Sequence, residues 1–136
     1  MSDTPFHPLA PGLEAQREYV IPQEWTIAHY DPALPAVLST PAMIGMMEIS
    51  AAQAVLSALR PGTLTVGTRI EVDHLKAVPA GATVLAKARL VEVNGRFLTF
   101  EVEATCGRDR IGRGRVFRAI VDRARFAEAA AVALNR

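Results

Sequence analysis

The chain has 136 residues, half of them hydrophobic, with 15 basic and 14 acidic side chains and a formal net charge of +1. This length fits one domain with its own core, so we expect a single domain over 1–136. The nearly even charge balance argues against nucleic acid as the main partner. The lone Cys106 cannot form an internal disulfide and suits a cytoplasmic location.

The N-terminal region is rich in proline and has no apolar segment after a basic region, so it does not resemble a secretory signal. We expect an irregular arm over 1–17, a short strand at Glu18–Ile21 and a second extended piece at Trp25–His29. The most apolar stretch, 41–59, is interrupted by polar side chains, so no membrane-spanning helix is expected.

The strongest predicted element is a helix that begins at Thr40-Pro41 and stops before Pro61-Gly62. Thr can cap the first free N–H groups, and Pro is tolerated at the start of a helix. Apolar residues fall on nearly every side of this segment, which is typical of a helix that is buried all round. Such a helix needs other elements to wrap around it.

Four long strands are predicted after the helix. They cover Thr65–Val78, Thr83–Val93, Arg96–Cys106 and Arg110–Val121, and Asn94-Gly95 is a strong hairpin signal between the second and third. The alanine-rich tail, 124–136, is expected to be helical. One buried helix and a mostly antiparallel set of strands predict an α+β protein with the hotdog fold, in which a curved sheet wraps a long central helix.

Glu48 and His74 are the first candidates for chemistry. Glu48 lies midway along the apolar helix, where an unpaired carboxylate is costly to bury. The alternative is that Glu48 lies at a solvated edge or pairs with an arginine for structure, but so apolar a helix favours a functional role. Strand alternation places His74 on the same side as Val66, Thr68, Ile70 and Val72, facing the helix. A lone histidine there is usually a core residue, but a sheet packed on the helix could bring it to Glu48.

Thr40 and Arg118 are further candidates. Capping explains Thr40 completely, although N–H groups at a helix start can also stabilise an oxyanion. Thr40 and Glu48 are eight positions apart, or about 12 Å along a helix, so a site using both is easier to build across a two-fold interface. Arg118 shares strand parity with Val116 and Ile120, which suggests a buried pair or a ligand contact.

Other basic side chains cluster near the last strand and are most simply a solvated face, although arginines pair well with phosphate oxygens. They are Lys76, Arg108, Arg110, Arg113 and Arg115. There is no G-x-S-x-G motif and no phosphate-binding glycine loop before a helix. The three histidines lack metal-ligand spacing, so we expect no metal site.

Three segments together resemble the fluoroacetyl-CoA thioesterase family of hotdog proteins. They are V-L-S-T-P-A-M-I-G-M-M-E (37–48), V-G-T-R-I-E-V-D-H-L (66–75) and I-G-R-G-R-V-F-R-A-I (111–120). The resemblance implies that Thr40, Glu48 and His74 are catalytic and that Gly67 and Arg118 lie near the substrate. It also implies a homodimer without metal or cofactor. The segment 30–38 is shorter than in the fluoroacetyl-specific member and lacks its phenylalanines, so the reaction type carries over rather than the substrate.

The function expected from these residues and the resemblance is hydrolysis of a small or medium acyl-CoA thioester. Glu48 would be either the nucleophile or the general base, and His74 would move protons or position water. Two alternatives stay open. One is a hotdog protein that binds acyl-CoA or another apolar ligand without hydrolysing it, and the other is a hotdog hydratase acting on an enoyl thioester.

Overall fold

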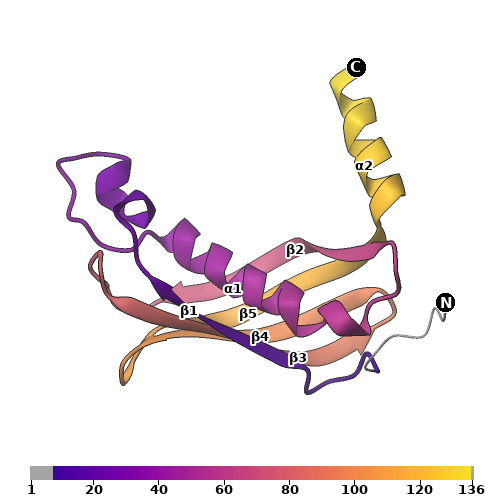
Figure 1. Cartoon of the computed structure of the whole chain (residues 1–136), viewed down its shortest axis with the longest axis horizontal. Helices are drawn as coiled ribbons and strands as arrows, with labels where there is room; N and C mark the ends of the chain where they lie inside the picture. The colour runs from indigo at the N-terminus through magenta and orange to yellow at the C-terminus, as the bar shows by residue number, and fades with distance from the viewer. Residues whose placement is uncertain (1–7, 136) are drawn as a thin grey trace.

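The computed structural model describes residues 8–135. One long helix lies along a five-stranded antiparallel sheet whose strand order is β1-β3-β4-β5-β2 (Figure 1). The strands are β1 (Glu14–Val20), β2 (Thr63–His74), β3 (Thr83–Asn94), β4 (Phe97–Cys106) and β5 (Asp109–Asp122). This arrangement confirms the predicted α+β hotdog fold.

The central helix α1 (Thr40–Ala54) packs mainly on β3 and β1. Its sheet-facing side carries buried methionines that interlock with apolar side chains of the strands. The largest buried members of this core are Ile21, Leu38, Met43, Met46, Met47, Leu90, Leu98, Phe100 and Ile111.

The prediction that the helix is buried on every side is wrong for the single chain. Pro41 and Gln53 are exposed, and Ile49 keeps 44% of its surface. The sheet covers only one side of α1, so the opposite side carries apolar residues that this chain leaves open. The prediction that Thr40 caps the helix is also wrong. Ser39 is the cap, because its Oγ accepts the N–H of Ala42 at 3.3 Å.

Two segments before the helix differ from the predictions. β1 begins at Glu14, inside the expected irregular arm, because the backbone of 14–20 pairs with β3 in an unbroken register. Residues 1–7 of that arm lie outside the described part of the chain. The segment expected to be extended at Trp25–His29 instead forms two short 3-10 turns, Gln23–Trp25 and Ile27–His29.

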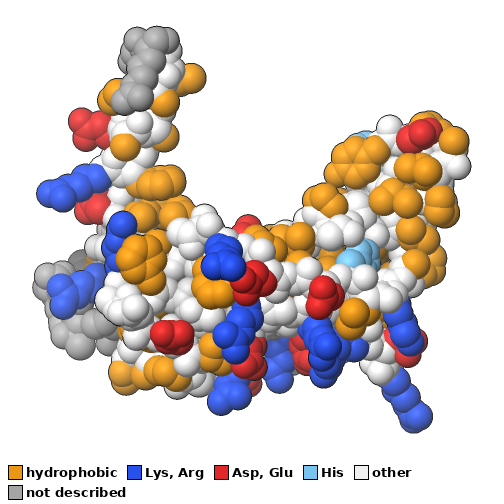
Figure 2. Space-filling view, turned by 180° about the vertical axis from the view of Figure 1, so that it is seen from behind, with side chains coloured by type: hydrophobic (Ala, Val, Ile, Leu, Met, Phe, Trp, Pro, Cys, Tyr) orange, Lys and Arg blue, Asp and Glu red, His pale blue; other side chains and the backbone are white. Residues whose placement is uncertain are grey.

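Two parts of the chain project from the sheet on the same side (Figure 1). One is the segment 21–39, which we call the arm loop, and the other is the C-terminal helix α2 (Arg123–Val132). Between them the surface is hollowed, as the space-filling view in Figure 2 shows. Within residues 8–135, no helix is long and apolar enough to cross a membrane.

Candidate functional site

Thr40 and His74 lie in direct contact at the start of α1. The Thr40 Oγ1 and His74 Nδ1 atoms are 2.8 Å apart and share a hydrogen bond. Because Ser39 supplies the helix cap, the Thr40 hydroxyl is free to make this contact. The other ring nitrogen of His74, Nε2, is buried and has no hydrogen-bond partner within the described residues. A buried polar atom that lacks a partner is unusual in a folded protein, and a functional role is one explanation for it.

A bulge in β2 decides which of its side chains face α1. The register with β5 shifts between Gly67 and Arg69, so Thr68 has no partner in the ladder. Before the bulge, Gly67 faces the helix, and after it Ile70 and Val72 pack against the core. A bulge resets the alternation of a strand. The prediction that Val66 and Thr68 share the face of His74 is therefore wrong. Val66 directly precedes the helix-facing Gly67, and Thr68 is exposed and donates to the Phe117 carbonyl oxygen.

Glu48, Gly67 and Arg118 form a second group of candidate residues. A Cβ atom built on Gly67 would lie 2.6 Å from Glu48 Oε1 and 3.6 Å from Arg118 Nη1. The carboxylate and the guanidinium thus converge over the backbone of Gly67, where any larger residue would displace the carboxylate. We call these three residues the Glu48 cluster.

Arg118 is buried and held at a fixed angle. Only 8% of its surface is exposed, and it donates from Nε to Thr65 Oγ1 at 2.9 Å and from Nη2 to the Thr65 carbonyl oxygen at 2.8 Å. Burial lowers the pKa of the Arg118 guanidinium from its ordinary value, and the charge of Glu48 acts in the opposite direction. The parity argument that singled out Arg118 on β5 is consistent with this buried position.

One chain does not bring all five candidates together. Thr40 is the first residue of α1 and Glu48 the ninth, so about 12 Å of helix axis separates them. Along β2, Gly67 lies on one side of the bulge and His74 at the far end of the strand. Within the single chain, the Thr40–His74 pair and the Glu48 cluster are therefore two separate groups.

A hollow of about 360 Å³ opens on the uncovered side of α1. The arm loop forms one wall and the helix forms the other, and the lining includes the only tryptophan of the chain. The sequence reasoning did not identify this hollow. Its lining residues are Glu24, Trp25, Tyr30, Ser39, Pro41, Ala42, Gly45, Met46 and Ile49.

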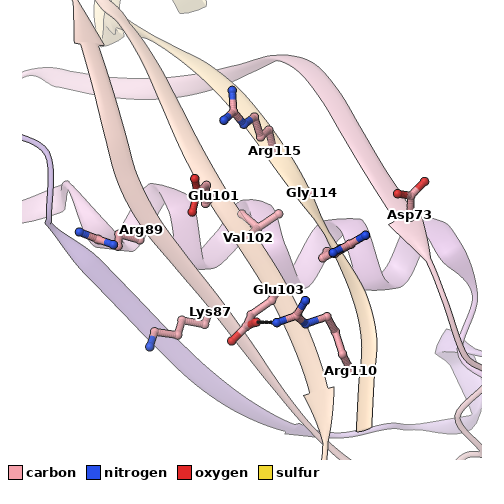
Figure 3. Close-up of a pocket in the computed structure, with 10 residues that line it drawn as sticks. Asp73, Lys87, Arg89, Glu101, Val102, Glu103, Arg110, Gly114 and Arg115 are labelled. Carbon is pink, nitrogen blue, oxygen red and sulfur yellow. Dashed lines mark ion pairs between the residues drawn. The ribbon is translucent and has the colours of Figure 1, made fainter.

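A larger hollow of about 530 Å³ lies on the face of the sheet opposite α1 (Figure 3). It is lined almost entirely by charged side chains of β2–β5, including several of the arginines considered for phosphate binding. Two of the basic residues considered for phosphate binding form ion pairs. Arg110 pairs with Glu103 at 3.5 Å, and Lys76 pairs with Asp109 at 3.0 Å. Within residues 8–135, no three His, Cys, Asp or Glu side chains gather as metal ligands would.

Comparisons with known proteins agree with the fold. The sequence profile of the fluoroacetyl-CoA-specific thioesterase family matches residues 21–124. A fluoroacetyl-CoA thioesterase from Streptantibioticus cattleyicolor is 36% identical over 121 residues, which cover 85% of this chain and 87% of that protein.

Solved structures give the same result. A structure of a fluoroacetyl-CoA thioesterase superposes with a TM-score of 0.85 at 33% identity and covers 91% of this chain and 96% of its own. A thioesterase superfamily member from Thermus thermophilus has the same TM-score at 29% identity and covers 96% of each chain. The chain belongs to the fluoroacetyl-CoA-specific thioesterase family, whose members are thioester hydrolases with the hotdog fold.

Proposed function

We propose that this protein hydrolyses an acyl-CoA thioester at a site built from Thr40, His74 and Glu48, with Gly67 and Arg118 beside the substrate. The observation that carries the proposal is the 2.8 Å contact between Thr40 and His74 in a chain of this family. It joins a hydroxyl to an imidazole whose other nitrogen is buried and free for a reactant. Structures of a relative include one variant bound to acetyl-CoA and another bound to fluoroacetate and CoA, which supports a CoA thioester as substrate class.

The complete site belongs to a homodimer. β2 is an edge strand of 12 residues, so one side of its backbone is open to a second copy of the same strand. Antiparallel pairing of two β2 strands about an axis near Ile70 places Gly67 of one subunit beside His74 of the other. Glu48 of each subunit then meets the Thr40–His74 pair of its partner, and two complete sites result.

The contacts of the first helical turn support Thr40 as the oxyanion donor. Pro41 has no N–H, the Ala42 N–H donates to Ser39 Oγ, and the Met43 N–H donates to the Ser39 carbonyl oxygen. These two N–H groups are therefore occupied and that of Pro41 is missing, and the role falls to Thr40, through its hydroxyl and its own N–H. When His74 carries its proton on Nδ1, it donates to Thr40 Oγ1, and the Thr40 hydroxyl proton can point at the thioester oxygen.

In that tautomer His74 Nε2 is a proton acceptor. If Glu48 is the nucleophile, its carboxylate bonds to the acyl carbon, the carbon–sulfur bond breaks, and the coenzyme A thiolate leaves and takes a proton from solvent; His74 Nε2 then accepts a proton from the water that hydrolyses the anhydride and frees Glu48. If Glu48 is the base, it takes the proton of the attacking water, which His74 positions, as the carbon–sulfur bond breaks and the thiolate leaves and is protonated. A single turnover in oxygen-18 water separates these routes, because only an anhydride route introduces the label into Glu48.

The hollow between the arm loop and α1 receives the acyl group. It begins at Ser39 and Pro41, on either side of Thr40, and its further lining includes Trp25, Met46 and Ile49. A lining of this kind suits an apolar acyl chain of small or medium size. No metal or cofactor other than the coenzyme A of the substrate is needed for these steps, and we propose a cytoplasmic location.

Thiol release from a panel of acyl-CoA substrates tests the activity. Hydrolysis that is lost in Glu48→Gln and His74→Ala, with dimers still folded, supports the proposal. Binding of acyl-CoA without thiol release, unchanged by Glu48→Gln, would show instead a binding protein. Hydration of crotonyl-CoA without thiol release would show a hydratase.

Mixing the two inactive variants tests the shared site separately. After random exchange of subunits, half of the dimers contain one Glu48→Gln and one His74→Ala chain, and each of these has one site with both residues intact. We expect thiol release to recover to about a quarter of the wild-type rate. No recovery, with subunit exchange verified by differently tagged chains, would place each site within one subunit.

A further inference from the structure

Thr65 is a polar residue that the sequence analysis did not single out, yet it makes both of the hydrogen bonds described for Arg118. It lies on β2, two residues before Gly67, and only 8% of its surface is exposed. Both its hydroxyl and its carbonyl oxygen accept from the guanidinium. A buried side chain and its own backbone thus grip one edge of Arg118.

The planar geometry of the guanidinium makes this grip directional. Nε and Nη2 form one edge of the group, and Nη1 points away from that edge. Fixing Nε and Nη2 on Thr65 therefore fixes the direction of Nη1, which faces Gly67 and Glu48. Within residues 8–135, Nη1 makes no hydrogen bond of its own, so its donors are available to the carboxylate or the substrate.

We propose that Thr65 is a positioning residue, which holds Arg118 so that its charge and its free Nη1 face the reacting end of the Glu48 cluster. The inference rests on the proposed function of that cluster. Arginine otherwise loses considerable rotamer freedom when it is fixed in one geometry. The two hydrogen bonds to Thr65 fix the Arg118 side chain in the free enzyme, before the substrate binds. Electrostatic catalysis requires groups that are oriented in this way in advance.

A structural role alone predicts something different. If the Thr65 hydroxyl only satisfies a buried donor, its removal lowers the stability of the fold but leaves the turnover of folded enzyme unchanged. If it positions Arg118, its removal lowers kcat even in fully folded protein, and the effect disappears when Arg118 is already absent.

The test compares Thr65→Val, which keeps the shape and removes the hydroxyl, with Thr65→Ser, which keeps the hydroxyl. We expect kcat for thiol release to fall about tenfold in Thr65→Val with little change in KM, and to return to near wild type in Thr65→Ser. Thr63→Val is the matched control, because Thr63 on the same strand bonds only the Arg60 carbonyl oxygen. If valine prevents folding, Thr65→Ala replaces it.

A double-mutant cycle with Arg118→Met completes the test. Thr65 acts through Arg118 only if Thr65→Val has no further effect on kcat in the Arg118→Met background. Multiplying effects, equal losses in Thr65→Val and Thr65→Ser, or a wild-type kcat in Thr65→Val would overturn the inference. Loss of thiol release in Glu48→Gln, measured alongside, keeps the proposed function standing in each of those cases, whereas retention would refute that function first.

Discussion

On the face of the sheet that α1 covers, ionisable side chains are few and lie among apolar neighbours. On the opposite face, two rows of opposite charges cross the strands (Figure 3). One row runs Glu14, Arg89, Glu101, Arg115 and Glu71, and the next runs Lys87, Glu103, Arg113 and Asp73. Each charge in these rows has a neighbour of the opposite sign on the adjacent strand.

The difference shows which charges are available for chemistry. In the charged rows, each ion lies opposite an ion of the other sign on the next strand and close to solvent, so these side chains contribute solubility and modest sheet stability. The mixed blue and red surface in Figure 2 shows the same intermingling. Near α1, the Arg118 guanidinium approaches Glu48 over Gly67, and within residues 8–135 a buried nitrogen of His74 has no hydrogen-bond partner. The site is distinguished by ionisable groups that have few compensating partners, and not by a large number of charges.

The largest expected effect comes from comparing the loss of one carboxylate on each face of the sheet. Glu48→Gln should lower kcat for thiol release about a thousandfold, because it removes the nucleophile or base while keeping the shape. Glu101→Gln, the same substitution in the charged row, should leave kcat unchanged. Steady-state thiol release with both purified variants checks this. Equal effects of the two substitutions would remove the distinction between the faces.

Much of the fold, and part of the difference between the two faces of the sheet, could be predicted from the sequence. Apolar spacing gave the helix, alternation gave the four long strands, and Asn94-Gly95 gave the hairpin, where Gly95 has the positive φ of 61° that this turn requires. Glu48 was identifiable because it interrupts an apolar helix. Arg118 was identifiable because its parity matches buried positions of β5.

The remainder depended on contacts that no local pattern encodes. The bulge at Thr68 shifts the facing of half of β2, and nothing in the alternation of that strand predicts it. Ser39 and Thr40 are both cap-type residues, and the backbone decides between them, because Ser39 is extended and Thr40 is already the first helical residue. The conformation of the arm loop is set by its tertiary contacts and not by a local sequence pattern. Its 3-10 turns and the hollow beside α1 were therefore not predicted.

Two glycines provide the second test, one beside Glu48 and one that lines the charged hollow on the opposite face of the sheet. Gly67→Ala adds a methyl group against the mobile end of Glu48, so we expect near-normal folding but about a hundredfold lower kcat from the displaced carboxylate. Gly114→Ala is the contrast, because its Cβ would lie 2.1 Å from the Glu71 carbonyl oxygen at a φ of +157°. That variant should lose thermal stability first. A stable and fully active Gly67→Ala variant would contradict the role of the Glu48 cluster.

Neighbouring hydroxyls at the start of α1 give a smaller effect of the same kind. Thr40→Val should lower kcat about tenfold with little change in the free energy of unfolding, because it removes the proposed oxyanion donor. Ser39→Ala should instead cost about 1 kcal/mol of unfolding free energy, because it removes the helix cap. Urea unfolding and thiol release, measured on both variants, separate the two roles. An exchange of these outcomes would mean that Thr40 is structural.

The smallest effect tests the charged rows themselves. Glu101 lies between Arg89 and Arg115, so Glu101→Arg places three cations in a line across β3, β4 and β5. Repulsion between exposed like charges should lower the unfolding free energy by about 1 kcal/mol at low salt, and about 0.5 M salt should recover most of the loss by screening. Thiol release should stay at the wild-type level at both salt concentrations. A loss that salt does not recover would mean that Glu101 contributes through packing, and a loss of turnover would mean that this face communicates with the site on the other side of the sheet.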